Sequence, residues 1–267
     1  MNKHPNCLYL AGAVLASLFL FVSIVYNNFV QKSIYEENSR HLLSTYEQVD
    51  KTFTMFVQHN WNALSDWSNN LQYLDDTENM KTLWYEFARR KDAWQYQDFY
   101  MFNENCDFIT AAGRDGNAPN IQGIFLDMYA TGQPVISSYI ASDSNRRIVF
   151  ALPMEVPYTI NGITYSGLAV SYNNDVVEKL IAGNIYQGQS DCYILTSDGN
   201  VLLSLEPKTE FLQHISNLFD FLNNYTDMTE TEITDLKKNI KNVSTGSLQC
   251  RYNKKNLLSG IRAHRDQ

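Results

Sequence analysis

The most constraining feature of this chain is a run from Pro5 to Gln31 that contains no charged side chain. Within it, residues 8–26 (LYLAGAVLASLFLFVSIVY) are almost all apolar. As a helix they would be roughly 28 Å long, about the thickness of the hydrocarbon core of a membrane. The alternative is a cleaved signal peptide, which needs small residues at its cleavage site, whereas this run ends in bulky ones. We therefore predict an uncleaved transmembrane helix.

The charges that flank this segment predict its orientation. Lys3 precedes it, and Lys32 follows it with Glu36 and Glu37 close behind. The positive-inside rule then favours an N-terminus in the cytoplasm and a large domain outside it. The chain contains no second apolar run of comparable length. We expect a single-pass protein of the cell membrane with an extracytoplasmic domain.

A helical pattern continues beyond the membrane segment. No Pro or Gly occurs between Asn28 and Leu74, and apolar residues recur there at the four-and-three spacing of a helix face. Such a helix would have about 47 residues and extend roughly 70 Å. Because its apolar stripe must be buried, we expect the second half to pack on a following domain and the half near the membrane to contact a second copy in a homodimer. A shorter helix is predicted from Thr77 to Arg90.

From Trp94 the pattern changes to that of strands. An amphipathic helix is predicted at 121–130, and a closing helix at 175–181. The predicted strands are residues 97–102, 106–111, 135–142, 146–155 and 165–172, with an Asn161-Gly162 turn between the last two. This order predicts an α+β fold with a PAS-like five-stranded antiparallel sheet, a helix across the sheet, and the long N-terminal helix behind it.

Four segments in sequence order resemble a known family. They are DFYMFNENCDFITAAG (98–113), TGQPVISSYI (131–140), RRIVFALPM (146–154) and YSGLAVSYNND (165–175). Together they resemble the membrane-distal module of double Cache (dCache) sensor domains. These are the extracytoplasmic input domains of bacterial histidine kinases, diguanylate cyclases and chemoreceptors. The segment CYILTSDGNVLLS (192–204) resembles the start of the second, membrane-proximal module.

The resemblance implies four parts in the chain. They are a cytoplasmic tip with the transmembrane helix at 1–31, the signalling helix with the short second helix at 32–92, a membrane-distal module at 93–185, and a membrane-proximal module at 186–267. In the last part we predict a hairpin at 191–204, helices from Lys208 to Asn223 and from Thr229 to Lys241, and strands at 245–252 and 256–264. A complete module of this type has one more strand, so we expect this module to be truncated.

Composition and motifs exclude several functions. The chain has 21 basic and 29 acidic residues and a net charge of −8, which disfavours nucleic acid as a partner. The sequence contains no CxxC pair of the kind that binds zinc. It also contains no sequence motif of a hydrolase, a phosphate-binding loop, a metalloprotease or a kinase. We expect no catalysis, no metal and no cofactor. Cys192 and Cys250 fall on predicted strands, and we expect a disulfide outside the cytoplasm if those strands are neighbours.

The resemblance also implies a small-molecule pocket between the sheet and the connecting helix and loops. By position its residues are Tyr96, Asp98, Tyr129, Ser137, Tyr139, Tyr172 and Asp175. Asp175 matches the acidic residue that pairs a ligand amine in amino-acid-binding relatives. The family's Tyr-x-x-x-x-Arg-x-Trp-Tyr run before the third strand is absent, so no arginine is implied there for a ligand carboxylate. In the alternative interpretation, Asp175 caps the closing helix and the tyrosines belong to the core.

These observations predict the ligand-sensing input region of a membrane signal-transduction receptor. The expected output domain is a histidine kinase of a two-component system. The next candidate for the output domain is a diguanylate cyclase. The alternative is a membrane-anchored extracytoplasmic binding protein with no output domain.

Overall fold

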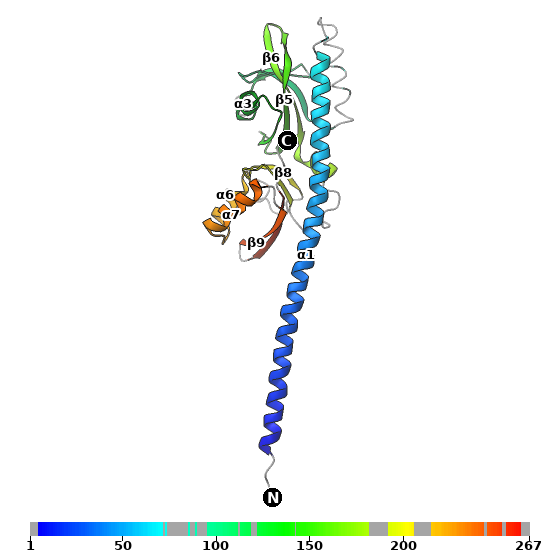
Figure 1. Ribbon diagram of the computed structural model, residues 1–267. Helices are drawn as coiled ribbons and strands as arrows, with labels where there is room; N and C mark the ends of the chain where they lie inside the picture. The colour runs from blue at the N-terminus through cyan, green and yellow to red at the C-terminus, as the bar shows by residue number, and fades with distance from the viewer. Residues whose placement is uncertain are drawn as a thin grey trace.

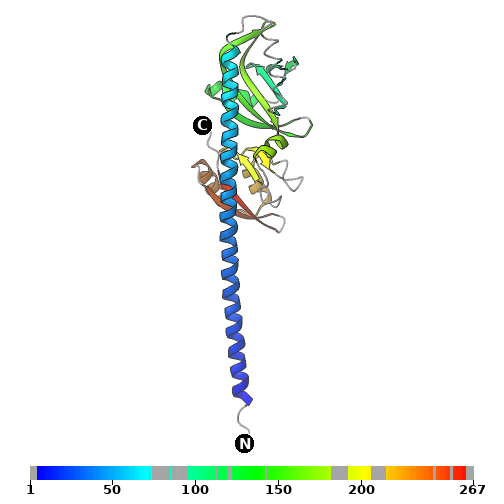
Figure 2. The ribbon, with the colours of Figure 1, turned by 90° about the vertical axis from the view of Figure 1, so that its right-hand side faces the viewer.

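The computed structural model describes residues 5–71, 73, 85, 89, 95–111, 113–118, 122–141, 143–181, 192–205, 215–242, 245–252 and 255–262. For residues 5–16, 42, 122, 192, 245–252 and 255–262 it describes the backbone alone. A helix of 67 residues, α1 (Pro5–Leu71), runs from the N-terminal region along both globular modules (Figures 1 and 2). Within the part of the chain whose side chains are described, no helix is long and apolar enough to cross a membrane.

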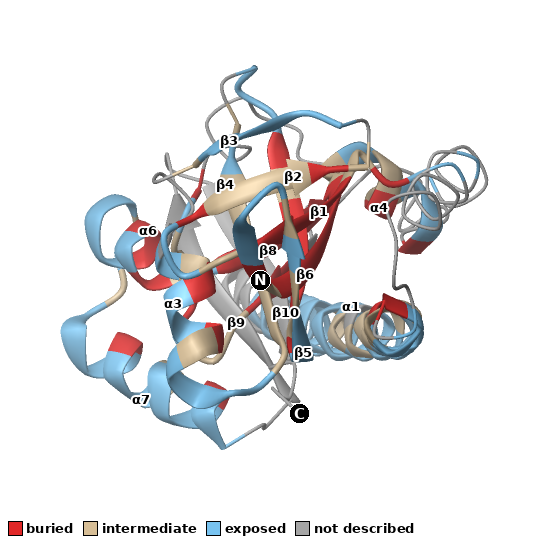
Figure 3. Ribbon diagram, turned by 90° about the horizontal axis from the view of Figure 1, so that it is seen from above, coloured by how far each residue is buried: buried red, intermediate tan, exposed pale blue. Residues whose placement is uncertain are grey.

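The second half of α1 packs on the globular part of the chain. Val49, Phe53, Val57, Leu64 and Leu71 are all buried, and their spacing places them on one face of the helix. Figure 3 shows α1 beside the sheet, with its buried and half-buried residues toward the other elements. The predicted packing of this half is therefore confirmed. The predicted helix from Thr77 to Arg90 lies largely outside the described residues.

A six-stranded antiparallel sheet forms the first module, in the order β3-β2-β1-β6-β5-β4. Its strands are β1 (Asp98–Phe102), β2 (Asp107–Thr110), β3 (Asp115–Asn117), β4 (Val135–Ile140), β5 (Arg146–Ile160) and β6 (Ile163–Asn173). The five predicted strands are confirmed, and β3 is one strand more. No strand pattern marks β3, because its three residues, Asp-Gly-Asn, are exposed and typical of a turn.

Two described helices of this module lie where they were predicted. Helix α3 (Gln122–Thr131) follows β3, and α4 (Asn174–Ile181) continues directly from β6. The turn between β5 and β6 is Asn161-Gly162, and both residues have the positive φ that a tight hairpin turn requires, 51° and 80°.

The two faces of the sheet have different partners. Toward α1, the strands present Phe99, Met101, Ile148 and Phe150 to a shared core. Toward α3, Phe102 of β1 stacks on Phe125 with ring centroids 3.7 Å apart. Gly167 lies opposite Phe102, and a Cβ at this position would come within 2.5 Å of the Phe102 ring. The close approach of this ring therefore requires glycine on β6.

The described part of the second module comprises two hairpins and two helices. Its described elements are β7 (Cys192–Leu195), β8 (Val201–Leu205), α6 (Leu218–Tyr225), α7 (Glu230–Lys241), β9 (Thr245–Tyr252) and β10 (Lys255–Arg262). The predicted capping box at the start of α7 is present, because Thr229 and Glu232 bond reciprocally. The predicted helix from Lys208 is wrong over residues 215–217, because Asn217 caps α6 and the helix begins after it. The β9–β10 hairpin lies against α1.

Candidate functional site

Polar side chains gather on one half of the first module's sheet, on the face away from α1. The register places Asp98 of β1 opposite Ser171 of β6, and Arg147 of β5 opposite both Asn173 of β6 and Tyr139 of β4. Residues paired across strands share a face, so these five belong to one surface. We call this surface, together with Tyr100, Arg114 and Ser137, the polar face.

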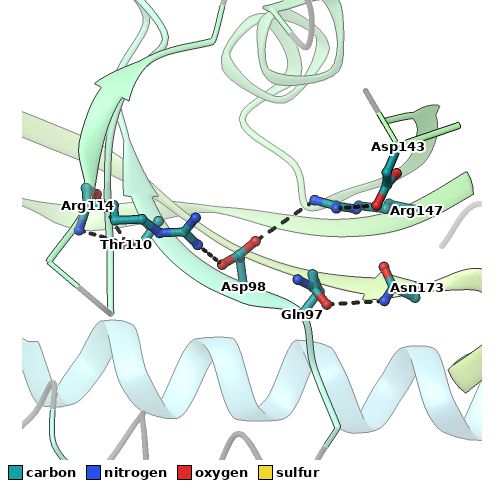
Figure 4. Close-up of polar contacts among 7 residues, drawn as sticks. All are labelled: Gln97, Asp98, Thr110, Arg114, Asp143, Arg147 and Asn173. Carbon is teal, nitrogen blue, oxygen red and sulfur yellow. Dashed lines mark hydrogen bonds and ion pairs between the residues drawn. The ribbon is translucent and has the colours of Figure 1, made fainter. Parts of the chain in front are cut away.

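Asp98 lies at the centre of the polar face between two guanidinium groups. Its carboxylate is 2.7 Å from Nη2 of Arg114 and 4.0 Å from Nη1 of Arg147. Arg147 also donates a hydrogen bond of 3.1 Å to Asp143. Figure 4 shows these side chains above the sheet, with Asp98 between the two arginines. The result is a compact cluster of two positive and two negative charges.

The environment of the polar face perturbs two of its groups. Burial raises the pKa of Tyr100 well above its ordinary value, and Tyr139 and Asp98 act in the same direction. Burial alone would lower the pKa of Arg147, but the hydrogen bond with Tyr139 and the charge of Asp143 outweigh it and raise that pKa. At neutral pH the face therefore presents a neutral phenol beside a permanent cation.

Four buried polar atoms of this face have no hydrogen-bond partner among the described residues. They are Oη of Tyr100, Oγ of Ser171, Oδ1 of Asn173 and Nε of Arg147. Buried polar atoms are normally paired, so four on adjacent strands form an unusual concentration. Two are hydroxyls, one is an acceptor only and one is a donor only, so together they suit a ligand that carries both donors and acceptors.

The other half of this face is apolar and filled. Phe125 and Met128 of α3 are buried against Phe102 and Ala169 of the sheet. Tyr129 of α3 is held at this end, because its hydroxyl donates to the carbonyl of Phe102 at 3.3 Å and accepts from Ser166 at 3.0 Å. Its side chain supports the packing of α3 rather than the charge cluster.

The structure brings some of the predicted ligand residues together and separates others. Asp98, Ser137 and Tyr139 lie on the polar face. Tyr96 and Tyr172 are buried in the core toward α1, where the hydroxyl of Tyr172 donates to Oδ1 of Asn60 at 2.8 Å. These two residues match the alternative interpretation, in which the tyrosines are core residues.

Asp175 does not join the polar face either. It is exposed in the first turn of α4, where the helix dipole stabilises a negative charge. The adjacent Asn174 binds the backbone of Ser204, with its Nδ2 at 2.7 Å from the carbonyl and its Oδ1 at 3.0 Å from the amide. Asp175 therefore lies at the start of a helix that connects the modules.

Sequence reasoning missed Tyr100, Arg114, Arg147, Ser171 and Asn173. A signal for four of them was present, because Tyr100 follows Asp98 by two residues on β1, Arg147 is the second residue of β5, and polar residues alternate with apolar ones at the end of β6. Polar residues at every second position of an otherwise apolar strand indicate one polar face. The position of Arg114 beside Asp98 depends on register, which the sequence does not specify.

The cysteines bear on two further predictions, the disulfide and the absence of a metal. The side chains of Cys192 and Cys250 lie outside the described ones, so the predicted disulfide stays a prediction. Cys106 is a buried free thiol. Within the described residues, no group of His, Cys, Asp and Glu is arranged to hold a metal ion.

Known sensory domains share this fold. The extracellular domain of the histidine kinase mmHK1S-Z3 matches with a TM-score of 0.57 and 11% identity, over 82% of this chain and 88% of its own. The sensory domain of the Campylobacter jejuni chemoreceptor Tlp3, solved with isoleucine bound, matches with a TM-score of 0.51 and 10% identity, over 86% and 89%. The ligand-binding domain of the Pseudomonas aeruginosa chemoreceptor PctB, in complex with L-Gln, gives 0.52 and 12%, over 82% and 80%.

At these identities the likeness is one of fold. It confirms the resemblance in fold to the sensory domains of chemoreceptors and histidine kinases. No protein-family model and no curated protein matches the sequence.

Proposed function

We propose that this chain is the ligand-sensing input region of a membrane signalling receptor, and that the polar face binds its ligand. The observation that carries the proposal is the cluster around Asp98, where two guanidinium groups and four buried unpartnered polar atoms converge on one sheet face. A merely structural ion pair would not need those atoms to remain unpaired. The fold shared with ligand-binding sensory domains supports the same conclusion.

The chemistry of the face favours a small zwitterion such as an amino acid. Nε of Arg147 and the exposed guanidinium of Arg114 suit a carboxylate, for which arginine has a matching fork of donors. Asp98 suits a ligand ammonium group, and Tyr100 with Ser171 suits further polar atoms. The isoleucine and L-Gln bound by the sensory domains named above belong to this class.

Membrane attachment and dimerisation belong to the same proposal. Leu18, Phe19, Phe21, Ile24 and Val25 are exposed apolar residues of the segment predicted to cross the membrane. Exposed apolar side chains of this density favour a lipid environment. We propose that α1 anchors the protein, with the modules outside the cytoplasm, and that two copies of α1 lie side by side.

The output domain of the proposed receptor follows from the family resemblance alone. A histidine kinase is the favoured output domain, and a diguanylate cyclase is the second candidate. The alternative is a membrane-anchored extracytoplasmic binding protein. The DNA downstream of codon 267 distinguishes them, since an open frame encoding a second apolar helix and a kinase or cyclase domain supports the receptor. A stop codon in an intact gene supports the binding protein.

Thermal unfolding of the full chain in detergent, titrated with each standard amino acid, tests the ligand site. A ligand at a hundredfold excess over its dissociation constant should stabilise the fold by about 2.7 kcal/mol. Asp98→Asn and Arg147→Gln should abolish the shift, whereas Asp66→Asn, at an exposed carboxylate of α1, should retain it.

The same titration separates two placements of the site. Asp175→Ala should leave the shift intact if the polar face binds the ligand. A shift that Asp175→Ala removes and Asp98→Asn retains would refute the polar face as the site. The absence of any shift across all amino acids would contradict the ligand class.

A further inference from the structure

A polar cavity lies between the modules, apart from the charge cluster around Asp98. It has a volume of about 680 Å³ and follows the free edge of β4, where this strand lies near α1, residues 124 and 127 of α3 and the turn between β7 and β8. Its lining is rich in hydroxyl groups, including those of Thr54, Ser138, Thr196 and Ser216. A cavity of this size with polar walls is large enough for a small metabolite.

Arg146 is the one arginine among the described residues that line this cavity, and only 8% of its surface is exposed. Nη1 donates to the carbonyl of Val201 at 2.8 Å and to the hydroxyl of Ser138 at 3.1 Å, and Nη2 donates to the carbonyl of Ile215 at 2.6 Å. All three acceptors are neutral. Within the described ranges, no carboxylate pairs with this guanidinium, and Nε has no partner.

The donor count of Arg146 leaves room for a carboxylate. A guanidinium has five N–H donors, and the described residues accept three of them. The two that remain equal the number that a carboxylate accepts in a bidentate pair with arginine. A buried charge without a counter-ion is costly, so an anion in the cavity would relieve a penalty that the protein otherwise bears.

The acidic residues of the lining do not supply that counter-ion. Asp198 is exposed and lies 3.6 Å from Nζ of Lys241. Asp127 is exposed on α3. Both therefore lie at the solvent side of the cavity, where water screens their charge.

From this arrangement we infer that the cavity between the modules is a second binding site, for a small carboxylate anion held by Arg146. Arg146 and Arg147 are consecutive on β5, and strand alternation directs their side chains to opposite faces of the sheet. The two arginines therefore serve separate sites, although the edge strand β4 contributes side chains to both. Ser138 of β4 and Arg146 of β5 both donate to the carbonyl of Val201, so they connect the two modules. An anion in the cavity would supply the counter-ion that the described residues do not provide for Arg146 at this contact.

Four probes test this site on the full chain in detergent: sodium acetate, succinate, malate and citrate, each against sodium chloride at the same ionic strength. We expect at least one carboxylate to raise the unfolding midpoint saturably. Arg146→Gln removes the charge but keeps a donor, and it should weaken that binding by about tenfold or more. Thr54→Trp fills the cavity from an exposed position on α1 without changing a hydrogen-bond partner of Arg146, and it should abolish binding.

Arg147→Gln is the matched control, because it disables the polar face and should leave carboxylate binding at the cavity unchanged. If Arg146→Gln does not fold, Thr54→Trp alone decides the question. The inference is overturned if none of the four carboxylates gives a saturable rise. It is also overturned if the rise persists in Thr54→Trp, or if Arg147→Gln removes it, since the binding would then belong to the polar face.

Discussion

One buried hydrogen bond fixes α1 against the sheet and can be measured. The hydroxyl of Tyr172 donates to Oδ1 of Asn60 at 2.8 Å, and these residues are 2% and 1% exposed. Asn60 also donates from Nδ2 to the carbonyl of Phe56 at 2.8 Å, so its side chain cannot turn to a new partner without losing that bond. Tyr172→Phe should therefore leave Oδ1 of Asn60 buried and unpaired.

The expected loss follows from that unpaired group. A buried acceptor deprived of its donor costs about 1–3 kcal/mol, so Tyr172→Phe should lower the free energy of unfolding by that amount. Asn60→Leu should cost a similar amount, because it strands the hydroxyl of Tyr172. In the double variant neither group is stranded, so its loss should be smaller than the sum of the single losses by at least about 1 kcal/mol.

Urea unfolding followed by tryptophan fluorescence suits this measurement. Trp61 of α1 packs edge-on against Phe150 with centroids 5.4 Å apart, so its emission reports the separation of α1 from the sheet. Tyr73→Phe, at a tyrosine that is 76% exposed, is the matched control and should change stability by less than about 0.5 kcal/mol. Additive losses in the double variant would refute the reasoning.

Three further predictions concern packing, capping and pH. Gly167→Ala should cost about 1–3 kcal/mol in urea unfolding because its Cβ would meet the Phe102 ring, whereas Gly123→Ala, which faces open space on α3, should be neutral or stabilising. Thr229→Ala should cost about 1 kcal/mol by removing the α7 cap, and Thr229→Ser should recover most of it. Burial raises the pKa of Tyr129 to about 12, so the stability that its neutral phenol contributes is complete below pH 10 and is lost between pH 10 and 12. The free energy of unfolding should therefore fall less steeply over this pH range in Tyr129→Phe than in the unsubstituted protein.

Most of the fold can be predicted from the sequence because local rules dominate it. Alternation along β5 and β6, the Asn161-Gly162 turn and the capping box before α7 each act within a few residues, and all three are present in the structure. The errors also have local causes. Asn217 caps α6, so residues 215–217 are not helical as predicted, and β3 consists of three exposed residues typical of a turn, so no strand pattern marks it.

The candidate site is predicted less well, because it depends on register between strands that are distant in sequence. Asp98 comes to lie beside Arg114 and Arg147 only once β1 is placed between β2 and β6. A shift of one residue in either pairing would turn Asp98 toward α1. The family resemblance implies Tyr96 and Tyr172 as ligand residues from their positions in the sequence. Successive residues of a strand point to opposite faces of the sheet, and the position in the sequence does not show which face a residue is on.

The end of β6 connects the two halves of the proposed mechanism. Ser171 and Asn173 face the polar cluster, whereas Tyr172 between them faces α1 and bonds Asn60. Because strand alternation fixes these opposite directions, a backbone displacement that moves Ser171 also moves Tyr172. A ligand on the polar face can change the position of α1 only to the extent that it binds two arrangements of this strand with different affinity. The double-variant cycle of Tyr172→Phe and Asn60→Leu, measured with and without ligand, tests whether the ligand changes the coupling energy between these two residues. A coupling energy that the ligand leaves unchanged would exclude the Tyr172–Asn60 hydrogen bond as the connection between the polar face and α1.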